Sequence, residues 1–365
     1  MLYHLAELLK QYFSGFNLFT YITVRFGLAI GTALLTGLLV GPAVIRLLKK
    51  LNIGQNIRNE EAPALHELHN HKAGTPTMGG LLIIAGTLSA TLLWADLSNR
   101  LVWLAMGAFL WLGLLGFWDD YIKLREKRSL GLRSLPKFAG QLLCGLVLGI
   151  HLYNNPVTWE HANKIDIIVL KDFYLPLGAF YILFVMLVLC GTSNAVNLTD
   201  GLDGLAIGSV IVAGLAYGVM AYAVSHFSIS TYLNVPHIPE AGELTVFCAA
   251  LVGASLAFLW YNCAPAEVFM GDTGSLALGG ALGTVAVLVK KELLLVIVGG
   301  LFVMEALSVI LQVASFKIRG KRIFLMAPIH HHFELKGWSE NKVVVRFWII
   351  AAMWALISIG TLKIW

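Results

Sequence analysis

Long apolar runs recur along the whole 365-residue sequence, and they constrain its fold more than any other feature. At roughly 17 to 24 residues, most of them reach the length that an α-helix needs to cross a bilayer. A helix satisfies its own backbone hydrogen bonds in lipid, so helix is the expected structure of each run. The sequence therefore predicts an all-α, polytopic membrane protein with one transmembrane domain, residues 1–365. Its ten expected spans lie near 20–41, 77–97, 101–118, 137–153, 173–191, 204–224, 243–260, 275–289, 293–316 and 343–363.

The composition agrees with a membrane protein and excludes several other classes. Hydrophobic residues make up 58% of the chain and charged residues only 13%, about half the charged fraction of a soluble domain. No basic stripe with interleaved aromatics is present, so nucleic acid is not an expected partner. The four cysteines have no paired metal-ligand spacing and are expected to be buried apolar residues.

The distribution of basic residues predicts the orientation in the membrane. The loops 42–76, 119–136, 192–203, 261–274 and 317–342, with Lys137 at an edge, carry seventeen Lys and Arg residues against seven on the other side. Cytoplasmic loops are the ones enriched in Lys and Arg. These loops are therefore expected in the cytoplasm. An even number of spans then leaves both termini outside.

Two adjacent carboxylates, Asp119 and Asp120, are expected at the end of the third span. Two negative charges at a helix C-terminus repel each other and oppose the helix dipole. Plain solvation at the membrane interface is one explanation. The other is that a metal ion or a proton-transfer role compensates the charge.

A second polar segment, 194–204, contains Asn197, Asp200 and Asp203 at a spacing of three. On a helix the three would share one face, whereas the glycines at 201 and 204 favour a tight turn that enters the sixth span. In both cases an amide and two carboxylates meet at a helix N-terminus, where anions are also stabilised. Capping of the helix alone would need only one of them.

A third segment, 262–275, runs from Asn262 through Phe269 to Asp272 and two glycines. Glycine allows a backbone to approach a ligand closely, Asp272 is a hard oxygen ligand suited to magnesium, and Phe269 could stack on a base. A simple helix cap is the competing explanation.

The fourth segment, 327–334, contains His330, His331 and His332 after Pro328. Three consecutive histidines cannot share one face of a helix, and the proline favours a loop. Such a tract is typical of metal or anion binding, although a polar loop without a role is also possible. Zinc is the less expected metal, because no cysteine accompanies the histidines.

One carboxylate, Glu305, lies inside a predicted span. A charge there is costly unless the side chain faces the bundle interior or a wet groove. It is expected to hydrogen-bond a neighbouring helix, or to mark a break in its own.

The charge rule places five aspartates from three distant loops on one membrane face. Carboxylates crowded in this way repel each other, and a bound divalent cation would relieve that repulsion. Lysines on the same face could hold phosphate groups. Magnesium, aspartates and lysines together predict phosphoryl transfer.

Taken together, these motifs resemble the bacterial phospho-N-acetylmuramoyl-pentapeptide transferase (translocase I) family. The matching stretches occur in the family's order, and the His-His-His motif separates it from relatives that transfer N-acetylglucosamine phosphate. They are 75–80, 117–121, 194–203, 269–275 and 327–334.

This resemblance implies a reaction and its site residues. Phospho-MurNAc-pentapeptide would pass from UDP-MurNAc-pentapeptide to undecaprenyl phosphate, giving lipid I and UMP, with Mg²⁺ required. The enzyme would be a ten-span homodimer of the bacterial inner membrane with its active site on the cytoplasmic face. The implied catalytic residues are Asp119, Asp120, Asp272 and His330, and the three aspartates would also hold the metal. The implied substrate contacts are Lys72, Thr77, Lys123, Lys137, Asn197, Asp200, Asp203, Asn262, Phe269, His331 and His332.

The mechanism and the rival functions stay open at this point. Direct attack of the lipid phosphate on the β-phosphorus, with Asp119 or Asp120 removing its proton, competes with a two-step route through a phospho-aspartate. A sister sugar-1-phosphate transferase is the alternative enzyme. A secondary transporter would need its ionisable residues near the bilayer midplane, and here nearly all carboxylates lie at helix ends. A purely structural membrane scaffold would need no carboxylate cluster.

Overall fold

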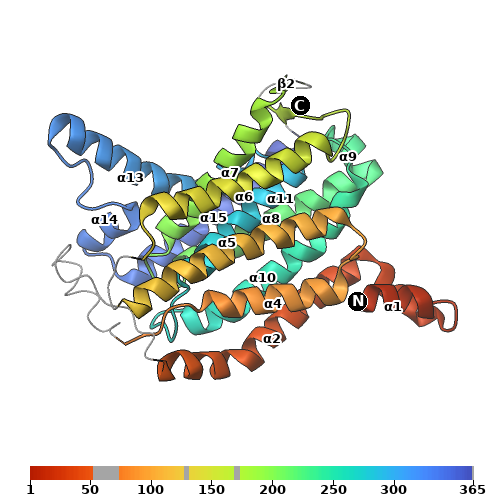
Figure 1. Cartoon of the computed structure of the whole chain (residues 1–365), viewed down its shortest axis with the longest axis horizontal. Helices are drawn as coiled ribbons and strands as arrows, with labels where there is room; N and C mark the ends of the chain where they lie inside the picture. Colours follow the sequence, from red (N-terminus) through yellow and green to blue (C-terminus); the bar gives the residue numbers. More distant parts are fainter. Residues whose placement is uncertain (52–73, 127–130, 168–172, 364–365) are drawn as a thin grey trace.

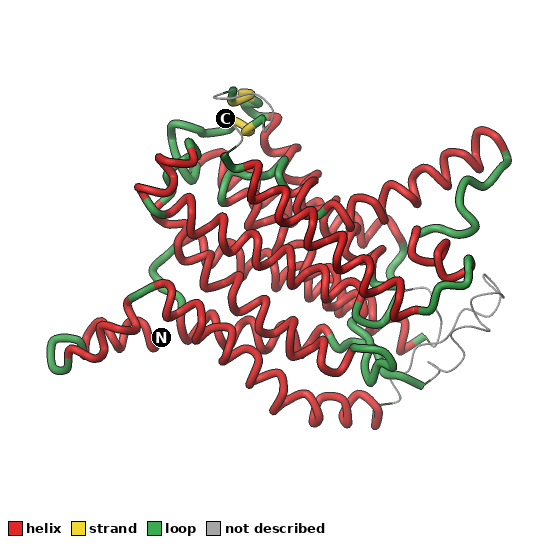
Figure 2. The backbone as a smooth tube through the Cα atoms, turned by 180° about the vertical axis from the view of Figure 1, so that it is seen from behind, coloured by secondary structure: helices red, strands yellow, loops and turns green. Residues whose placement is uncertain are grey.

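The protein is described by a computed structural model that covers residues 1–51, 74–126, 131–167 and 173–363 (Figure 1). Helices dominate these residues, and the only sheet among them is one antiparallel pair of short strands (Figure 2). In chain order the elements are α1 (Leu2–Leu9), η1 (Ser14–Thr20), α2 (Ile22–Lys50), α4 (Gly80–Trp94), α5 (Arg100–Arg125), α6 (Ser134–Asn154), β1 (Lys164–Asp166), β2 (Tyr174–Pro176), α7 (Phe180–Thr199), α8 (Leu205–Ser225), α9 (Phe227–Leu233), η3 (Pro239–Ala241), α10 (Gly242–Asn262), α11 (Gly271–Leu288), α12 (Leu295–Val298), α13 (Gly300–Arg319), α14 (Ile329–Leu335) and α15 (Glu340–Thr361).

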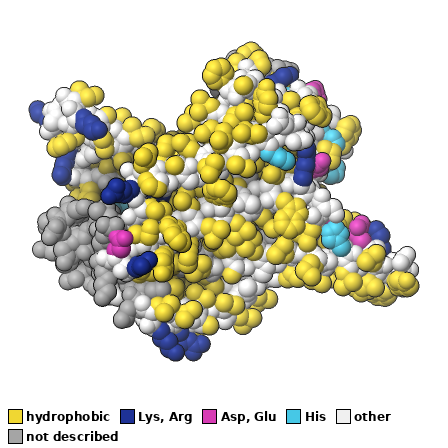
Figure 3. Space-filling view, viewed as in Figure 1, with side chains coloured by type: hydrophobic (Ala, Val, Ile, Leu, Met, Phe, Trp, Pro, Cys, Tyr) yellow, Lys and Arg dark blue, Asp and Glu magenta, His cyan; other side chains and the backbone are white. Residues whose placement is uncertain are grey.

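Membrane-spanning character is present in most of the long helices. Among the described residues, eight helices are long and apolar enough to cross a bilayer: α2, α5, α6, α7, α8, α10, α13 and α15. The apolar helix α4 is shorter, with 15 residues, and α11 has 18. Apolar side chains cover the middle of the face drawn in Figure 3, and charged ones gather toward its two ends. The predicted all-α, multi-pass membrane fold is confirmed.

Helices α10 and α11 form the centre of the bundle. Nearly every residue of both is buried, including small ones such as Ala250, Gly279 and Gly280. Helix α11 packs against α4, α5, α7 and α8, while α10 packs against α2, α4 and α8. Because lipid tails are as apolar as the helices, such packing depends on small residues that let backbones approach. A helix that is apolar on all sides is expected at such a centre.

The two ends of the bundle carry different parts of the chain. Both termini lie at one end, where the Met1 amine donates to the carbonyl of Leu92 near the end of α4, and Lys363 donates to the carbonyl of Tyr232 (Figure 1). The segments that join α7 to α8, α10 to α11 and α14 to α15 lie at the opposite end. Their convergence brings the predicted polar motifs to one place.

Several local predictions differ from the structure. Asp119 and Asp120 do not end their helix, because α5 continues to Arg125 and its Lys123 then reaches back to both aspartates. The histidine tract is not a loop: it forms the short helix α14, with Pro328 at the N-cap, where a proline leaves no helical hydrogen bond unmade. The break in the ninth span falls at Gly299, between α12 and α13, and not at Glu305.

Candidate functional site

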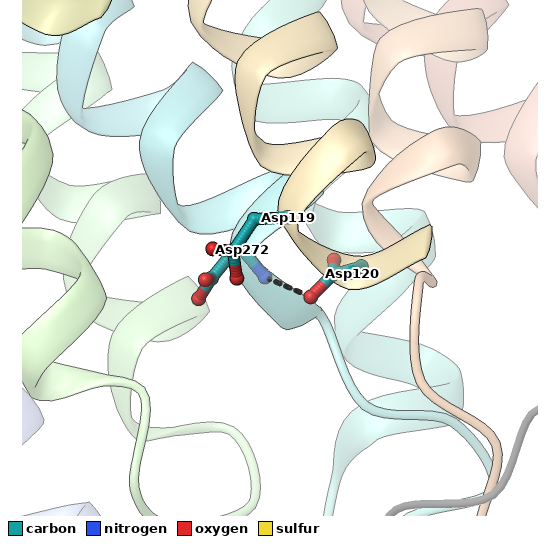
Figure 4. Close-up of side chains that lie close together, drawn as sticks. All are labelled: Asp119, Asp120 and Asp272. Carbon is teal, nitrogen blue, oxygen red and sulfur yellow. Dashed lines mark hydrogen bonds between the residues drawn. The ribbon is translucent and has the colours of Figure 1, made fainter. Parts of the chain in front are cut away.

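Three carboxylates meet where α5 reaches the N-terminus of α11. Asp119 and Asp120 come from α5 and are almost fully buried, and Asp272 comes from the first turn of α11 (Figure 4). One oxygen from each lies within 4.8 Å of the others. Aspartates 152 residues apart in sequence are thus brought together by helix packing, as the sequence predicted.

Very close helix packing makes this convergence possible. A Cβ added to Gly116 of α5 would lie 2.1 Å from the backbone oxygen of Asp272, and one added to Gly80 of α4 would lie 2.1 Å from the backbone nitrogen of Gly274. Gly271 has a φ of +71°, which L-residues adopt rarely, and this lets the chain turn into α11 directly beneath Asp120. Glycine is therefore required at the points where three helices touch.

Both carboxylate oxygens of Asp120 accept hydrogen bonds from the N-terminus of α11. Its Oδ2 accepts hydrogen bonds from the backbone N–H of Thr273 at 2.9 Å and the Thr273 hydroxyl at 2.8 Å, while its Oδ1 accepts from the Asp272 N–H at 3.2 Å. The first N–H groups of a helix have no partner inside that helix. A carboxylate from a neighbouring helix thus caps α11 and fixes the direction in which Asp272 leaves it.

Two lysines surround the carboxylates. The Lys123 Nζ lies 2.6 Å from Asp119 Oδ2, 3.4 Å from Asp120 Oδ1 and 2.8 Å from Asp272 Oδ2. The Lys137 Nζ, from the first turn of α6, lies 2.7 Å from the same oxygen of Asp272. With three carboxylates and two ammonium groups, the cluster keeps one formal negative charge.

The amide of Asn197 completes the surroundings of Asp272. Its Nδ2 lies 2.6 Å from Asp272 Oδ1 and 2.8 Å from the hydroxyl of Ser275, one turn further along α11. Asn197 belongs to the last turn of α7, so a fourth helix, after α5, α6 and α11, contributes to the same centre. The predicted residues Asp119, Asp120, Lys123, Lys137, Asn197 and Asp272 therefore form one connected cluster.

The predicted nucleotide-side residues hold two loops together. An oxygen of Asp203 accepts the N–H of Ala266 at 3.0 Å, and the Asp203 N–H donates to Glu340 of α15. Asn262 bridges the same loops, accepting the Gly204 N–H at 3.0 Å and donating to the Val268 carbonyl. The turn after α7 is a tight turn with Gly204 at a φ of +82°, as the glycine pattern favoured.

Other predicted residues lie near the loops that Asp203 and Asn262 hold together. Phe269 is half-buried and pairs through its backbone with Pro76 and Gly79, beside the half-buried Thr77. Asp200 is half-buried in the turn after α7. Lys72 lies outside the described residues.

The three histidines have three different environments. His330 is fully buried, with Nδ1 at 3.1 Å from Glu305 Oε2 of α13. The His331 ring lies 2.7 Å from Glu334 of its own helix, and the Nδ1 of His332 accepts the N–H of Leu325. These contacts of the three rings are made with Glu305, Glu334 and Leu325 and not with the three aspartates.

Sequence reasoning missed several residues that shape the cluster. Thr273 and Ser275 bond to Asp120 and Asn197, and the N–H of Leu132 donates to Asp119 Oδ1 at 2.9 Å. Thr273 and Ser275 stand in the motif already singled out, so their position was a usable signal. Leu132 carried none, because only its backbone takes part.

Comparison with known proteins identifies the family. Residues 102–290 match the model of glycosyl transferase family 4, and residues 72–84 match phospho-N-acetylmuramoyl-pentapeptide-transferase signature 1. A relative named phospho-N-acetylmuramoyl-pentapeptide-transferase from Desulfatibacillum aliphaticivorans is 54% identical, with all of both chains aligned. The chain belongs to this transferase family. Relatives of the same name from Desulforapulum autotrophicum and Koribacter versatilis are 52% and 50% identical over the whole of this chain and 100% and 99% of theirs.

The carboxylate cluster of this transferase fits a metal ion. The Lys123 ammonium already contacts all three carboxylates at once, so a single cationic centre can reach Asp119, Asp120 and Asp272. Carboxylate oxygens are the ligands that hard divalent cations prefer. The acidic triad can therefore hold a divalent metal if Lys123 swings aside.

Proposed function

We propose that this chain transfers phospho-MurNAc-pentapeptide from UDP-MurNAc-pentapeptide to undecaprenyl phosphate, releasing UMP and forming lipid I. Family membership at 54% identity supports the reaction class. The single structural observation that carries the proposal is the group of three carboxylates and two lysines at the end of a central membrane helix. Such a position can be reached by a soluble nucleotide sugar from one side and a lipid phosphate from the other.

The proposed metal is Mg²⁺, held by Asp119, Asp120 and Asp272. When bound, it would neutralise and polarise the diphosphate of the donor. Lys123 and Lys137 would then move from Asp272 to phosphate oxygens, because ammonium groups are mobile point charges on flexible stems. Asn197 would keep Asp272 oriented through the exchange.

Direct attack is the proposed chemistry. An oxygen of the lipid phosphate attacks the β-phosphorus, the bond from this phosphorus to the bridging oxygen breaks, and UMP leaves with that oxygen. Asp119 is the better candidate to accept the proton of the lipid phosphate, since its Oδ2 is held by the flexible Lys123, whereas both oxygens of Asp120 are engaged in capping α11. The route through a phospho-aspartate is the competing hypothesis.

A trapping experiment separates the two routes. With donor labelled in the β-phosphate and no acceptor lipid, we expect no labelled protein after a rapid acid quench, because direct attack forms no covalent intermediate. Omitting Mg²⁺ is the control for non-specific labelling. Stoichiometric label that passes to lipid when undecaprenyl phosphate is added would overturn direct attack.

The remaining substrate roles are proposals of the same kind. Lys72, Asp203, Asn262 and Phe269 would surround the uridine, with the bonds of Asp203 and Asn262 shaping the loops around it. Thr77, Asp200, His331 and His332 would line the rest of the donor pocket. His330 would be a catalytic residue at the edge of this pocket. We also propose a homodimer in the bacterial inner membrane, with this end of the bundle in the cytoplasm.

Donor choice and metal dependence test the function directly. We expect purified protein to release UMP from UDP-MurNAc-pentapeptide with undecaprenyl phosphate, and to release little from UDP-GlcNAc. EDTA should abolish release and Mg²⁺ should restore it, because the ammonium groups of Lys123 and Lys137 cannot polarise the diphosphate as a divalent ion does. Preference for UDP-GlcNAc would favour the sister enzyme. Full activity in EDTA would contradict the metal proposal.

A further inference from the structure

A buried acid–imidazole pair lies outside the carboxylate cluster. Glu305 of α13 and His330 of α14 are both 0% exposed, with the carboxylate Oε2 3.1 Å from the ring Nδ1. Their neighbours in sequence, Met304 and Ile329, pack against an apolar cluster that includes Leu301 and Phe347. Burying such groups costs several kcal/mol of desolvation, and a pair of apolar side chains of similar size is often as stable.

The pair differs from a buried ion pair that stabilises the fold at the other end of the bundle. There the Arg25 guanidinium donates to both oxygens of Glu243 at 2.6 and 2.7 Å, and also to the Trp94 carbonyl. In contrast, all four polar side-chain atoms of Glu305 and His330 lack a hydrogen-bond partner among the described residues, and the pair meets only as a 3.1 Å contact between Oε2 and Nδ1. A purely structural pair would be expected to satisfy these atoms. His330 therefore keeps an unused ring nitrogen that is fully buried.

The unused nitrogen faces the turn between α7 and α8. A Cβ added to Gly201 would lie 2.3 Å from His330 Nε2, so the ring rests directly against this turn. The turn follows Asn197, which holds Asp272, and contains Asp203, which holds the loop before α11. The ring of His330 thus contacts the segment that connects the two halves of the site.

We infer that Glu305 is a positioning residue for the transfer reaction, acting through His330. Its carboxylate keeps the proton of the imidazole on Nδ1 and fixes the ring plane, so that Nε2 is presented to the Gly201 turn. A carboxylate beside one ring nitrogen favours the proton there and so sets the role of the other nitrogen. The inference rests on the proposed function, because His330 is a proposed reaction residue.

Substitution of Glu305 tests the inference in the full-length protein. Glu305→Gln keeps the size of the side chain but removes the charge that fixes the tautomer. We expect kcat for UMP release to fall about 10- to 100-fold with KM for the donor changed little, as for other carboxylates that orient a functional histidine. The matched control is Glu243→Gln, which breaks the other buried pair: it should lower the melting temperature but leave kcat per folded molecule unchanged.

A spectroscopic readout separates positioning from a general structural role. With ¹⁵N-labelled histidine, and His330→Asn used to assign the signal, the parent should show a proton on Nδ1 and Glu305→Gln should show a changed tautomer population. Lower kcat together with this change supports the inference. A kcat within twofold of the parent overturns it, as does a lower kcat with an unchanged ring signal. If the parent itself releases no UMP, the proposed function fails instead, and the ring signal still reports whether Glu305 fixes the tautomer.

Glycine substitution displaces the ring without touching Glu305. Gly201→Ala would place a methyl group 2.3 Å from Nε2. We expect it to lower kcat at least as much as Glu305→Gln. Gly191→Ala, also on the α7 side and with nothing within 4 Å of the added carbon, is the control and should match the parent. Parental kcat in Gly201→Ala would contradict a requirement for a fixed ring.

Discussion

Asp272→Asn is expected to abolish most UMP release, with a loss on the order of a thousandfold, the upper end of the effect of removing one group that stabilises a transition state. Asp272 receives contacts from Lys123, Lys137 and Asn197, so its carboxylate is the common partner of the cluster. The amide keeps the volume but removes one negative charge. It also brings an N–H group toward two ammonium groups, so both lysines and a metal lose their shared anion. Initial rates with UDP-MurNAc-pentapeptide and saturating Mg²⁺ measure the effect.

A matched substitution controls for general damage by this change. Asp166→Asn also removes a carboxylate that pairs with a lysine, Lys291, but at the other end of the bundle. It should retain most of the parental rate. A well-folded Asp272→Asn protein with more than a tenth of parental activity would contradict the role of the cluster.

Gly116→Ala is expected to lower activity about 100-fold and also to lower the melting temperature. The added methyl group would lie 2.1 Å from the Asp272 backbone oxygen, and backbone cannot move aside as a flexible side chain can. Helices α5 and α11 must therefore separate, which moves Asp119 and Asp120 away from Asp272. Overpacking costs about 1–3 kcal/mol, and a displacement of about 1 Å near the reacting groups can cost about 100-fold in rate.

Gly107→Ala provides the comparison within the same helix. Nothing lies within 4 Å of a carbon added at Gly107, so this change should leave activity intact and raise helix stability slightly. Melting curves and rates of UMP release, measured for Gly116→Ala and Gly107→Ala, test this difference. Equal behaviour of the two variants would show that the α5–α11 contact does not control the geometry of the site.

The sequence alone determined the architecture and the membership of the central cluster. Each apolar run must satisfy its backbone within lipid, so helix formation is fixed locally. Helices that cross the membrane up and down then bring the polar motifs back to the same end. Counting Lys and Arg was enough to group Asp119, Asp120, Asp203 and Asp272 on one end of the bundle. Lys123 was placed on the same face as a phosphate contact, and its ion pair with Asp272 became visible only in the structure.

Only the tertiary structure decided which partner each polar side chain has within the bundle. No local pattern indicates that Asp120 caps α11, because its partners are backbone groups 152 residues away. The histidine tract became a helix because Pro328 could serve as its N-cap, and Glu305 found its partner in His330 of α14. Such pairings depend on which helices touch and at what depth. Contacts between helices depend in turn on the packing of small residues such as Gly80, Gly116 and Gly274. The effect of these residues appears only when the whole bundle is assembled.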